Sequence, residues 1–221
     1  MRDPTSKRPS GGRYPGYDVL TKRDSPSWNA KTREVIAHRL AIGSQPKFFT
    51  ADEFLTVKAI AERIVPQPQD RLPIPVAGLV DDRLHSGKSD GFRRAGMPQE
   101  GDAWRVAIKA LDAEAAAGHG NSFRALTERD QNALLARMEK GDLKSAAWNG
   151  LRSDELFTHR IARDIVYAYY AHPSAWSEIG WGGPASPRGY VRMDFNERDP
   201  WEAAEIKDGD VEQARRDNRR V

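Results

Sequence analysis

The histidines and their neighbouring carboxylates are the side chains that could bind a metal ion in this chain. There are five histidines: His38, His85, His119, His159 and His172. None belongs to an HxxxH or HExxH pair. Asp82 and His85, and Glu155 and His159, come near the Glu-x-x-His spacing of di-metal helical bundles, but the first pair has Asp and the second has one residue too many. We therefore expect no metal site.

The motifs of nucleophilic and phosphate chemistry are also missing. The chain has no Cys and no G-x-S-x-G, and its Gly-Lys-Ser at 87–89 lacks the first Gly of a phosphate loop. The glycines of "GGPASPRG", residues 182–189, are separated by prolines and follow a predicted helix rather than a strand. We expect no catalytic, cofactor-binding or metal-binding residue here. A stand-alone helical enzyme with a carboxylate or metal site is the alternative.

Aromatic residues gather near the end of the chain, where six Tyr and Trp lie between Tyr167 and Tyr190. One helix face cannot bury them all, and Tyr and Trp dominate the energetics of protein interfaces. In the alternative interpretation Trp176 and Trp181 fold back on the preceding helix and cap the core. The candidate partner interface comprises Tyr169, Tyr170, His172, Trp176, Gly180, Trp181, Gly182, Gly183, Pro184, Tyr190 and Trp201. Its glycines should permit close backbone approach or positive φ.

Helices must position these residues, because apolar side chains recur at spacings of three and four and no segment alternates as strands do. We predict a mainly α, irregular domain of about five or six helices with Pro/Gly-rich connections. The expected helices lie near 28–42, 51–65, 76–85, 102–118, 128–140 and 153–171. Asn29, Thr50, Asp102, Thr127 and Ser153 are the expected N-caps, with Glu53 completing a capping box, and Gly118 and Gly141 are the expected ends.

Composition indicates polar arms on either side of this domain. Apolar residues make up 38% of the chain, charged residues 30%, and the mean hydropathy is −0.73, so one modest core is expected. We predict an irregular N-terminal arm at 1–27, the helical domain at 28–190 and an extended C-terminal tail at 191–221. The formal net charge of +3, without a basic stripe, does not favour nucleic-acid binding. The sequence contains no apolar run of about 18 residues, so we predict no membrane-spanning helix.

Three segments, in this order, resemble the small subunit (subunit 3) of the gluconate 2-dehydrogenase family. They are "FFTADEFLTVKAIAERIVPQP", "LDAEAAAGHGNSFRALTERDQNALL" and "YYAHPSAWSEIGWGGPASPRGY", and the similarity spans roughly residues 48–190. The resemblance implies a non-catalytic, bacterial accessory subunit. Such a subunit binds, stabilises and helps mature a large FAD-dependent dehydrogenase of the glucose–methanol–choline type, which oxidises a sugar, polyol or sugar acid such as gluconate.

The same resemblance implies cofactors outside this chain: FAD in the large subunit, and haem c where a cytochrome c subunit accepts the electrons. Many members carry a twin-Arg export signal, which this sequence lacks. We expect a periplasmic location if the partner carries the signal, and a cytoplasmic one otherwise. A transient assembly chaperone is the remaining alternative. The inner half of the aromatic segment (Ile165, Val166, Tyr169) should support the core, and the outer half, from Trp181 to Tyr190, should face the partner.

Overall fold

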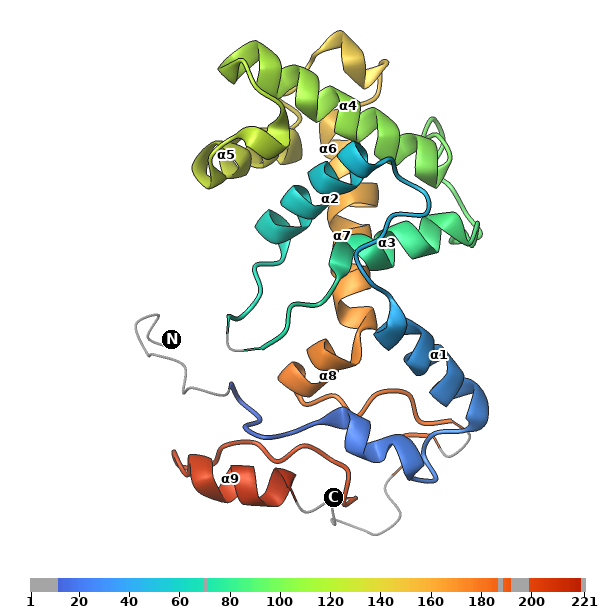
Figure 1. The fold of residues 1–221 in the computed structure, drawn as a ribbon, viewed down its shortest axis with the longest axis vertical. Coiled ribbons are helices and arrows are strands. Elements are labelled where there is room, and N and C mark those ends of the chain that lie inside the picture. The colour runs from blue at the N-terminus through green and yellow to red at the C-terminus, as the bar shows by residue number, and fades with distance from the viewer. Residues whose placement is uncertain (1–11, 70, 187–188, 192–198, 220–221) are drawn as a thin grey trace. The chain divides into compact units, whose positions relative to one another are not determined.

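The expected mainly α class is confirmed by the computed structural model, which describes residues 12–69, 71–186, 189–191 and 199–219 (Figure 1). Strand pairing within these residues is limited to one isolated bridge between Trp28 and Ser186. The chain divides into two compact units. The terminal unit comprises Met1–Ala41 and Tyr170–Val221, and the central unit comprises Ile42–Tyr169. No helix in the described ranges has the length and apolar character that crossing a membrane requires.

Six α-helices of ten residues or more lie in the described part of the chain, in line with the expected number. They are α1 (Ala30–Ala41), α2 (Ala51–Ile64), α3 (Val76–His85), α4 (Glu100–His119), α5 (Glu128–Lys140) and α7 (Ala162–Ala171). Shorter helices are α6 (Ser153–Leu156), α8 (Pro173–Ile179) and α9 (Val211–Asn218). The 3-10 turns are η1 (Val19–Asp24), η2 (Phe123–Ala125) and η3 (Ala146–Trp148), and η4 (Phe157–Ile161) is a π-helical turn between α6 and α7.

Most helix ends follow from their local sequence. Asn29 and Thr127 accept backbone hydrogen bonds as N-caps, and Thr50 with Glu53 forms the predicted capping box. The expected caps at Asp102 and Ser153 are wrong. The first lies inside α4, which begins at Glu100, and the second is already the first residue of α6.

The predicted end of α4 at Gly118 is also wrong. The helix continues through His119, and Gly120 ends it in the left-handed conformation, with φ of 71°. Gly118 therefore lies within the helix, although the motif of a helix followed by glycine is present two residues later.

The central unit is built around α4, whose Trp104 and Leu111 are completely buried. This helix contacts α2, α6, η2, η3 and η4. The connection before α2 is fixed by the buried Asp81 of α3, which accepts hydrogen bonds from the backbone N–H groups of residues 47, 48 and 49 at 2.7, 3.1 and 2.9 Å. A single carboxylate thus sets the direction in which the chain enters α2.

The terminal unit has a small aromatic core made by segments that are far apart in the sequence. Tyr17, Val19, Trp28, Ile36 and Trp176 form this core. Its backbone contacts include a hydrogen bond from the Val19 N–H to the Ser177 hydroxyl at 3.1 Å. Residues 12–27, expected to be irregular, therefore contribute both η1 and buried side chains.

The C-terminal segment contributes to the terminal unit through α9, a helix within the range expected to be an extended tail. The buried Asn218 side chain donates to the Pro15 and Ala204 carbonyls, both at 2.9 Å, and accepts from the Ala204 N–H at 2.6 Å. One amide therefore ties the last described helix to residues near the start of the chain.

Candidate functional site

Three of the predicted interface residues lie in the interior of their own units. Tyr169 is buried in the central unit, where its hydroxyl accepts a hydrogen bond from Arg71 at 2.8 Å. In the terminal unit His172 caps α8 by accepting from the Ser174 N–H, and the buried Trp176 donates its indole N–H to the Tyr170 carbonyl. The position of Trp176 corresponds to the local packing alternative.

The glycines of the segment allow aromatic rings to approach the backbone closely. Gly180 ends α8 with φ of 69°, and a Cβ there would lie 2.5 Å from the ring of Tyr14. Gly183 also has φ of 69°, and its Cβ would lie 3.0 Å from Trp176 and 3.3 Å from Trp28. Both positions therefore favour glycine through conformation and through space.

The remaining predicted residues lie nearer the surface of the terminal unit. Gly182 is half-buried and accepts a hydrogen bond at its carbonyl from Lys22 at 2.7 Å, and Pro184 is half-buried too. Tyr170 and Trp181 are 46% and 39% exposed, and Tyr190 is 69% exposed. Ile179, at the end of α8, is also exposed.

Four aromatic residues surround a hollow of about 470 Å³ in the terminal unit. These residues are Tyr14, Trp181, Tyr190 and Trp201, and we call this feature the aromatic hollow. The Trp181 ring also packs edge-on against Trp176, with ring centroids 4.9 Å apart. The hollow therefore has a wall attached to the core and an outer rim of exposed side chains. Charged side chains, among them Lys22, Asp199 and Glu202, also line the hollow, so it offers both apolar and polar contacts to another molecule.

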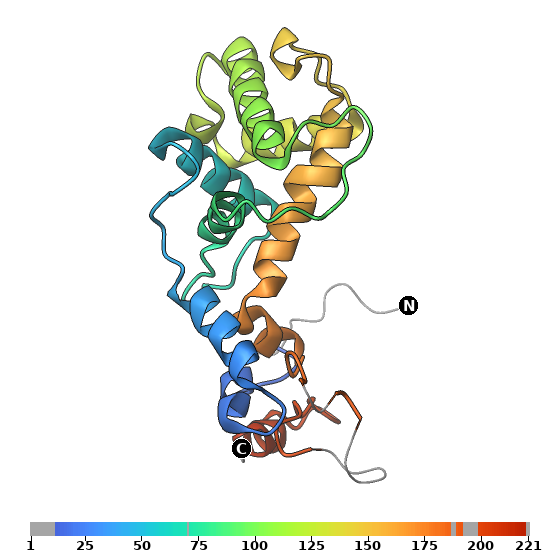
Figure 2. The same ribbon diagram turned by 90° about the vertical axis from the view of Figure 1, so that its right-hand side faces the viewer.

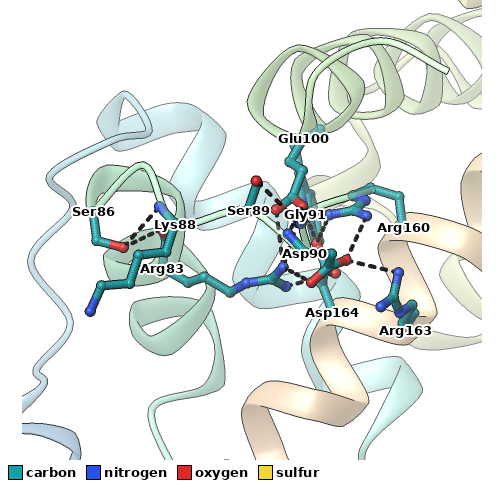
Figure 3. A network of polar contacts seen from close by, with 11 residues as sticks. Arg83, Ser86, Lys88, Ser89, Asp90, Gly91, Glu100, Arg160, Arg163 and Asp164 are labelled. Atoms are coloured by element: carbon teal, nitrogen blue, oxygen red, sulfur yellow. Dashed lines mark hydrogen bonds and ion pairs between the residues drawn. The ribbon is translucent and has the colours of Figure 1, made fainter. Parts of the chain in front are cut away.

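The central unit contains a network of three arginines and three carboxylates, which we call the arginine–carboxylate network (Figure 3). Its members are Arg83 of α3, Asp90 of the following connection, Glu100 of α4, Arg160 of η4, and Arg163 and Asp164 of α7. Representative distances are 3.0 Å from Arg160 to Glu100, 3.2 Å from Arg83 to Asp164 and 2.9 Å from Arg163 to Asp90. These ion pairs hold together five segments of the central unit.

Asp164 lies at the buried end of this arginine–carboxylate network. Its side chain is 3% exposed, and it accepts a hydrogen bond from the Trp104 indole at 2.8 Å. Burial raises the pKa of the Asp164 carboxyl, and this effect outweighs the opposing hydrogen bond from Trp104 and the charges of Arg160 and Arg83. The network therefore stabilises a carboxylate whose charged form is costly in that position.

Sequence reasoning missed this network, although one local signal was present. Arg160 and Asp164 stand four residues apart, beside the buried Ile161 and Ile165 of the same helical stretch. Opposite charges on an otherwise apolar helix face are unusual, because burial of charge requires a partner. The other partners come from distant segments and give no local pattern.

The carboxylates of the two near-miss metal spacings pair with basic side chains from other segments. Glu155 and His159 lie 3.7 Å apart, and Arg94 contacts both. Asp82 pairs with Lys47 at 2.9 Å. Among the described residues, no group of three or more His, Asp or Glu side chains is placed to hold a metal ion.

A comparison with models of protein families gives one match along most of the helical part of the chain. The model described as gluconate 2-dehydrogenase subunit 3 matches residues 51–183, and this confirms the resemblance found in the sequence motifs. Comparisons with curated proteins and with solved structures gave no match.

Proposed function

The chain belongs to the gluconate 2-dehydrogenase subunit 3 family, whose model covers more than half of its residues, and from this premise we propose that it is the non-catalytic small subunit of a dehydrogenase complex. The family's description is that of one subunit among several. The proposed task of this subunit is to bind, stabilise and help mature a larger subunit. That partner would be a glucose–methanol–choline type dehydrogenase, with FAD, that oxidises a sugar, polyol or sugar acid.

The observation that carries the proposal is the exposed aromatic rim of the terminal unit. Trp181 and Tyr190 border the aromatic hollow, and exposed Tyr and Trp beside a hollow are typical anchors of protein interfaces. Because Trp181 also packs against the buried Trp176, its ring is already held in place before a partner binds. Less side-chain entropy is then lost on association.

Flavin chemistry belongs to the partner in this proposal, and haem c to a third subunit where electrons leave through a cytochrome. The role proposed for this chain is a contact surface. Its loss should lower the amount of assembled, flavin-loaded dehydrogenase rather than change the chemistry of the flavin. A variant of this chain should therefore change the yield and stability of the complex more than it changes the turnover rate of each assembled enzyme.

Co-purification of the tagged chain with a flavoprotein tests the proposal. The tagged chain is expressed with a candidate dehydrogenase subunit, and the eluate is examined for flavin absorbance and for dehydrogenase activity. We expect a stable complex that contains flavin. Leu72→Ala, at a highly exposed apolar residue of the central unit, is the control for non-specific loss of surface. A chain that stays monomeric beside folded, flavin-loaded partner would refute the proposal.

The same preparation distinguishes a resident subunit from an assembly chaperone. The complex is isolated before and after the partner acquires FAD. A resident subunit stays bound to the flavin-loaded enzyme in a fixed ratio. A chaperone is released at that step, and this result would replace the proposed role with the alternative one.

A further inference from the structure

A second hollow, of about 610 Å³, lies in the central unit beside the arginine–carboxylate network. Phe92, Arg93 and Arg94 line it from the connection between α3 and α4, and Arg160, Arg163 and Tyr167 line it from η4 and α7. We call it the arginine groove. Figure 2 shows this connection running alongside the helical stretch that contains η4 and α7. None of these six residues belongs to the aromatic hollow.

Two arginines of the groove, Arg93 and Arg94, lie outward, whereas Arg160 and the carboxylates of the network lie inward. Arg93 is exposed and has no hydrogen bond or ion pair within the described ranges, and Arg94 is half-exposed, with contacts to Glu155 and His159 on one side. The carboxylates of Asp90, Glu100 and Asp164 are mostly or fully buried beneath them. A ligand that enters the groove therefore meets guanidinium groups first. Guanidinium forks match the geometry of carboxylates.

Arg163 is held in place before any ligand arrives. Its guanidinium carbon lies 5.7 Å from the centre of the Phe92 ring and 5.1 Å from that of Tyr167, and it pairs with Asp90. These contacts fix a long side chain that would otherwise lose rotamer freedom on binding. The groove is thus pre-organised on one wall, and the free Arg93 completes the other.

Two exposed rings distinguish this groove from a site for a small anion. Phe92 is 69% exposed and Tyr167 is 57% exposed. A free phosphate or carboxylate would leave both rings in water. A peptide segment could place its carboxylates on the arginines and an apolar side chain on the rings, so that both kinds of surface are used.

We propose that the arginine groove is a docking site for an acidic segment of a protein partner, with Asp or Glu carboxylates next to an apolar or aromatic side chain. The carboxylates pair with Arg93 and Arg94, and the apolar side chain covers Phe92 and Tyr167. The His159 ring also lines the groove and contacts Arg94, while Glu100 is engaged with Arg83 and Arg160. This surface is additional to the one that carries the proposed function.

Fluorescence anisotropy with a labelled peptide tests the proposal on the full chain, without any dehydrogenase. The probe is fluorescein-labelled Gly-Glu-Glu-Trp-Glu-Glu-Gly, and the comparison peptide has Gln at every Glu. We expect the acidic peptide to bind about tenfold more tightly at low salt, and to lose this advantage at high salt because exposed charges are screened. Equal affinity for the two peptides would overturn the proposal.

Two variants locate the binding on the groove. Arg93→Gln should weaken binding of the acidic peptide by about threefold to fivefold, the scale of an exposed ion pair, and Phe92→Ala by about twofold to tenfold, the scale of an aromatic contact. Both side chains are exposed, so the fold is retained. Arg129→Gln, an equal loss of charge at an exposed residue of α5, should have no effect. Wild-type affinity in both groove variants would contradict the proposal.

Competition with inorganic phosphate tests the choice of a peptide. Unlabelled acidic peptide should displace the probe, and phosphate of equal total charge should do so only weakly. If phosphate displaces the probe as well as the peptide does, the groove is a small-anion site and the proposal is wrong. Because the dehydrogenase is absent from these measurements, their failure is distinct from a failure of the co-purification.

Discussion

Tyr190→Ala offers the sharpest separation between the stability of this chain and its proposed association with a partner. The Tyr190 side chain is 69% exposed, whereas Trp181 is only 39% exposed and packs against Trp176. Removing Trp181 therefore removes contacts within the terminal unit as well as contacts with the partner. Removing Tyr190 takes away mainly surface that is free to be buried in a complex.

The exposed areas set the size of the expected effects. A Tyr side chain has roughly 200 Å² to bury, so 69% exposure leaves roughly 140 Å² for a partner and roughly 60 Å² already covered by the chain. At about 25 cal/mol per Å², these areas correspond to ceilings of about 3.5 kcal/mol for binding and about 1.5 kcal/mol for folding. A hot-spot loss of about 2 kcal/mol would weaken the complex about thirtyfold.

The measurement compares the dissociation constant of the complex with the unfolding free energy of the free chain. Binding to the immobilised flavoprotein gives the first, and urea unfolding followed by far-ultraviolet circular dichroism gives the second. Tyr190→Ala should change binding more than folding, and Trp181→Ala should lower both. Leu72→Ala should change neither by a comparable amount. If Tyr190→Ala bound the flavoprotein as tightly as the Leu72 control, the aromatic hollow would not be the interface.

Two further predictions concern buried carboxylates of the central unit. Asp81→Asn should lower the unfolding free energy by about 1–3 kcal/mol, because an amide nitrogen cannot accept one of the three backbone hydrogen bonds. The control Asp82→Asn removes an ion pair to the half-exposed Lys47 and should lower it by under about 1 kcal/mol. Urea unfolding measures both variants, and equal losses would contradict this reasoning. For Asp164, burial raises the pKa, so the folded state binds more protons than the unfolded state, whose pKa is about 3.9. The quantity to measure is the unfolding free energy of wild type minus that of Asp164→Asn. This difference should fall as pH rises from about 3.9 through the pKa of Asp164 in the folded state, and then level off. A difference that rises with pH would show that the arginine charges outweigh burial in setting this pKa.

Local sequence was sufficient to locate the helices of ten residues or more, because their determinants lie within a few residues of each end. The bounds of α3 match the prediction, and the caps at Thr50 and Thr127 form as expected. The local rule failed at Asp102, because α4 begins at Glu100 after Gln99, which forms no side-chain capping hydrogen bond. Helix ends of this kind vary by one or two residues and are not fixed by a capping pattern.

The role of the chain's N-terminal segment could not be predicted, because several of its partners are more than 150 residues away. Polar and Pro/Gly-rich composition suggested an irregular arm, yet Tyr17 and Val19 are buried against residues such as Trp176. Two or three apolar side chains are enough to anchor a segment when a partly built aromatic core is available. Composition averages over the segment and conceals those few residues.

The same limit applies to the arginine–carboxylate network. Each charged residue, taken alone, is typical of a solvated helix face or loop. Only the combination of η4 and α7 with α3, α4 and their connection gives every buried charge an opposite charge. The pairing of Arg160 with Asp164 was visible in the sequence, but its burial was not.

The glycine-rich segment after α8 illustrates how two functions of one sequence pattern are separated in space. Gly183 lies so close to Trp176 and Trp28 that a Cβ would crowd both rings, so this glycine serves the core of the terminal unit. The backbone held in this way projects Trp181 toward the aromatic hollow, with its ring edge against Trp176. The glycines therefore allow close packing of aromatic rings, and in our proposal the partner binds the ring that this packing holds in place.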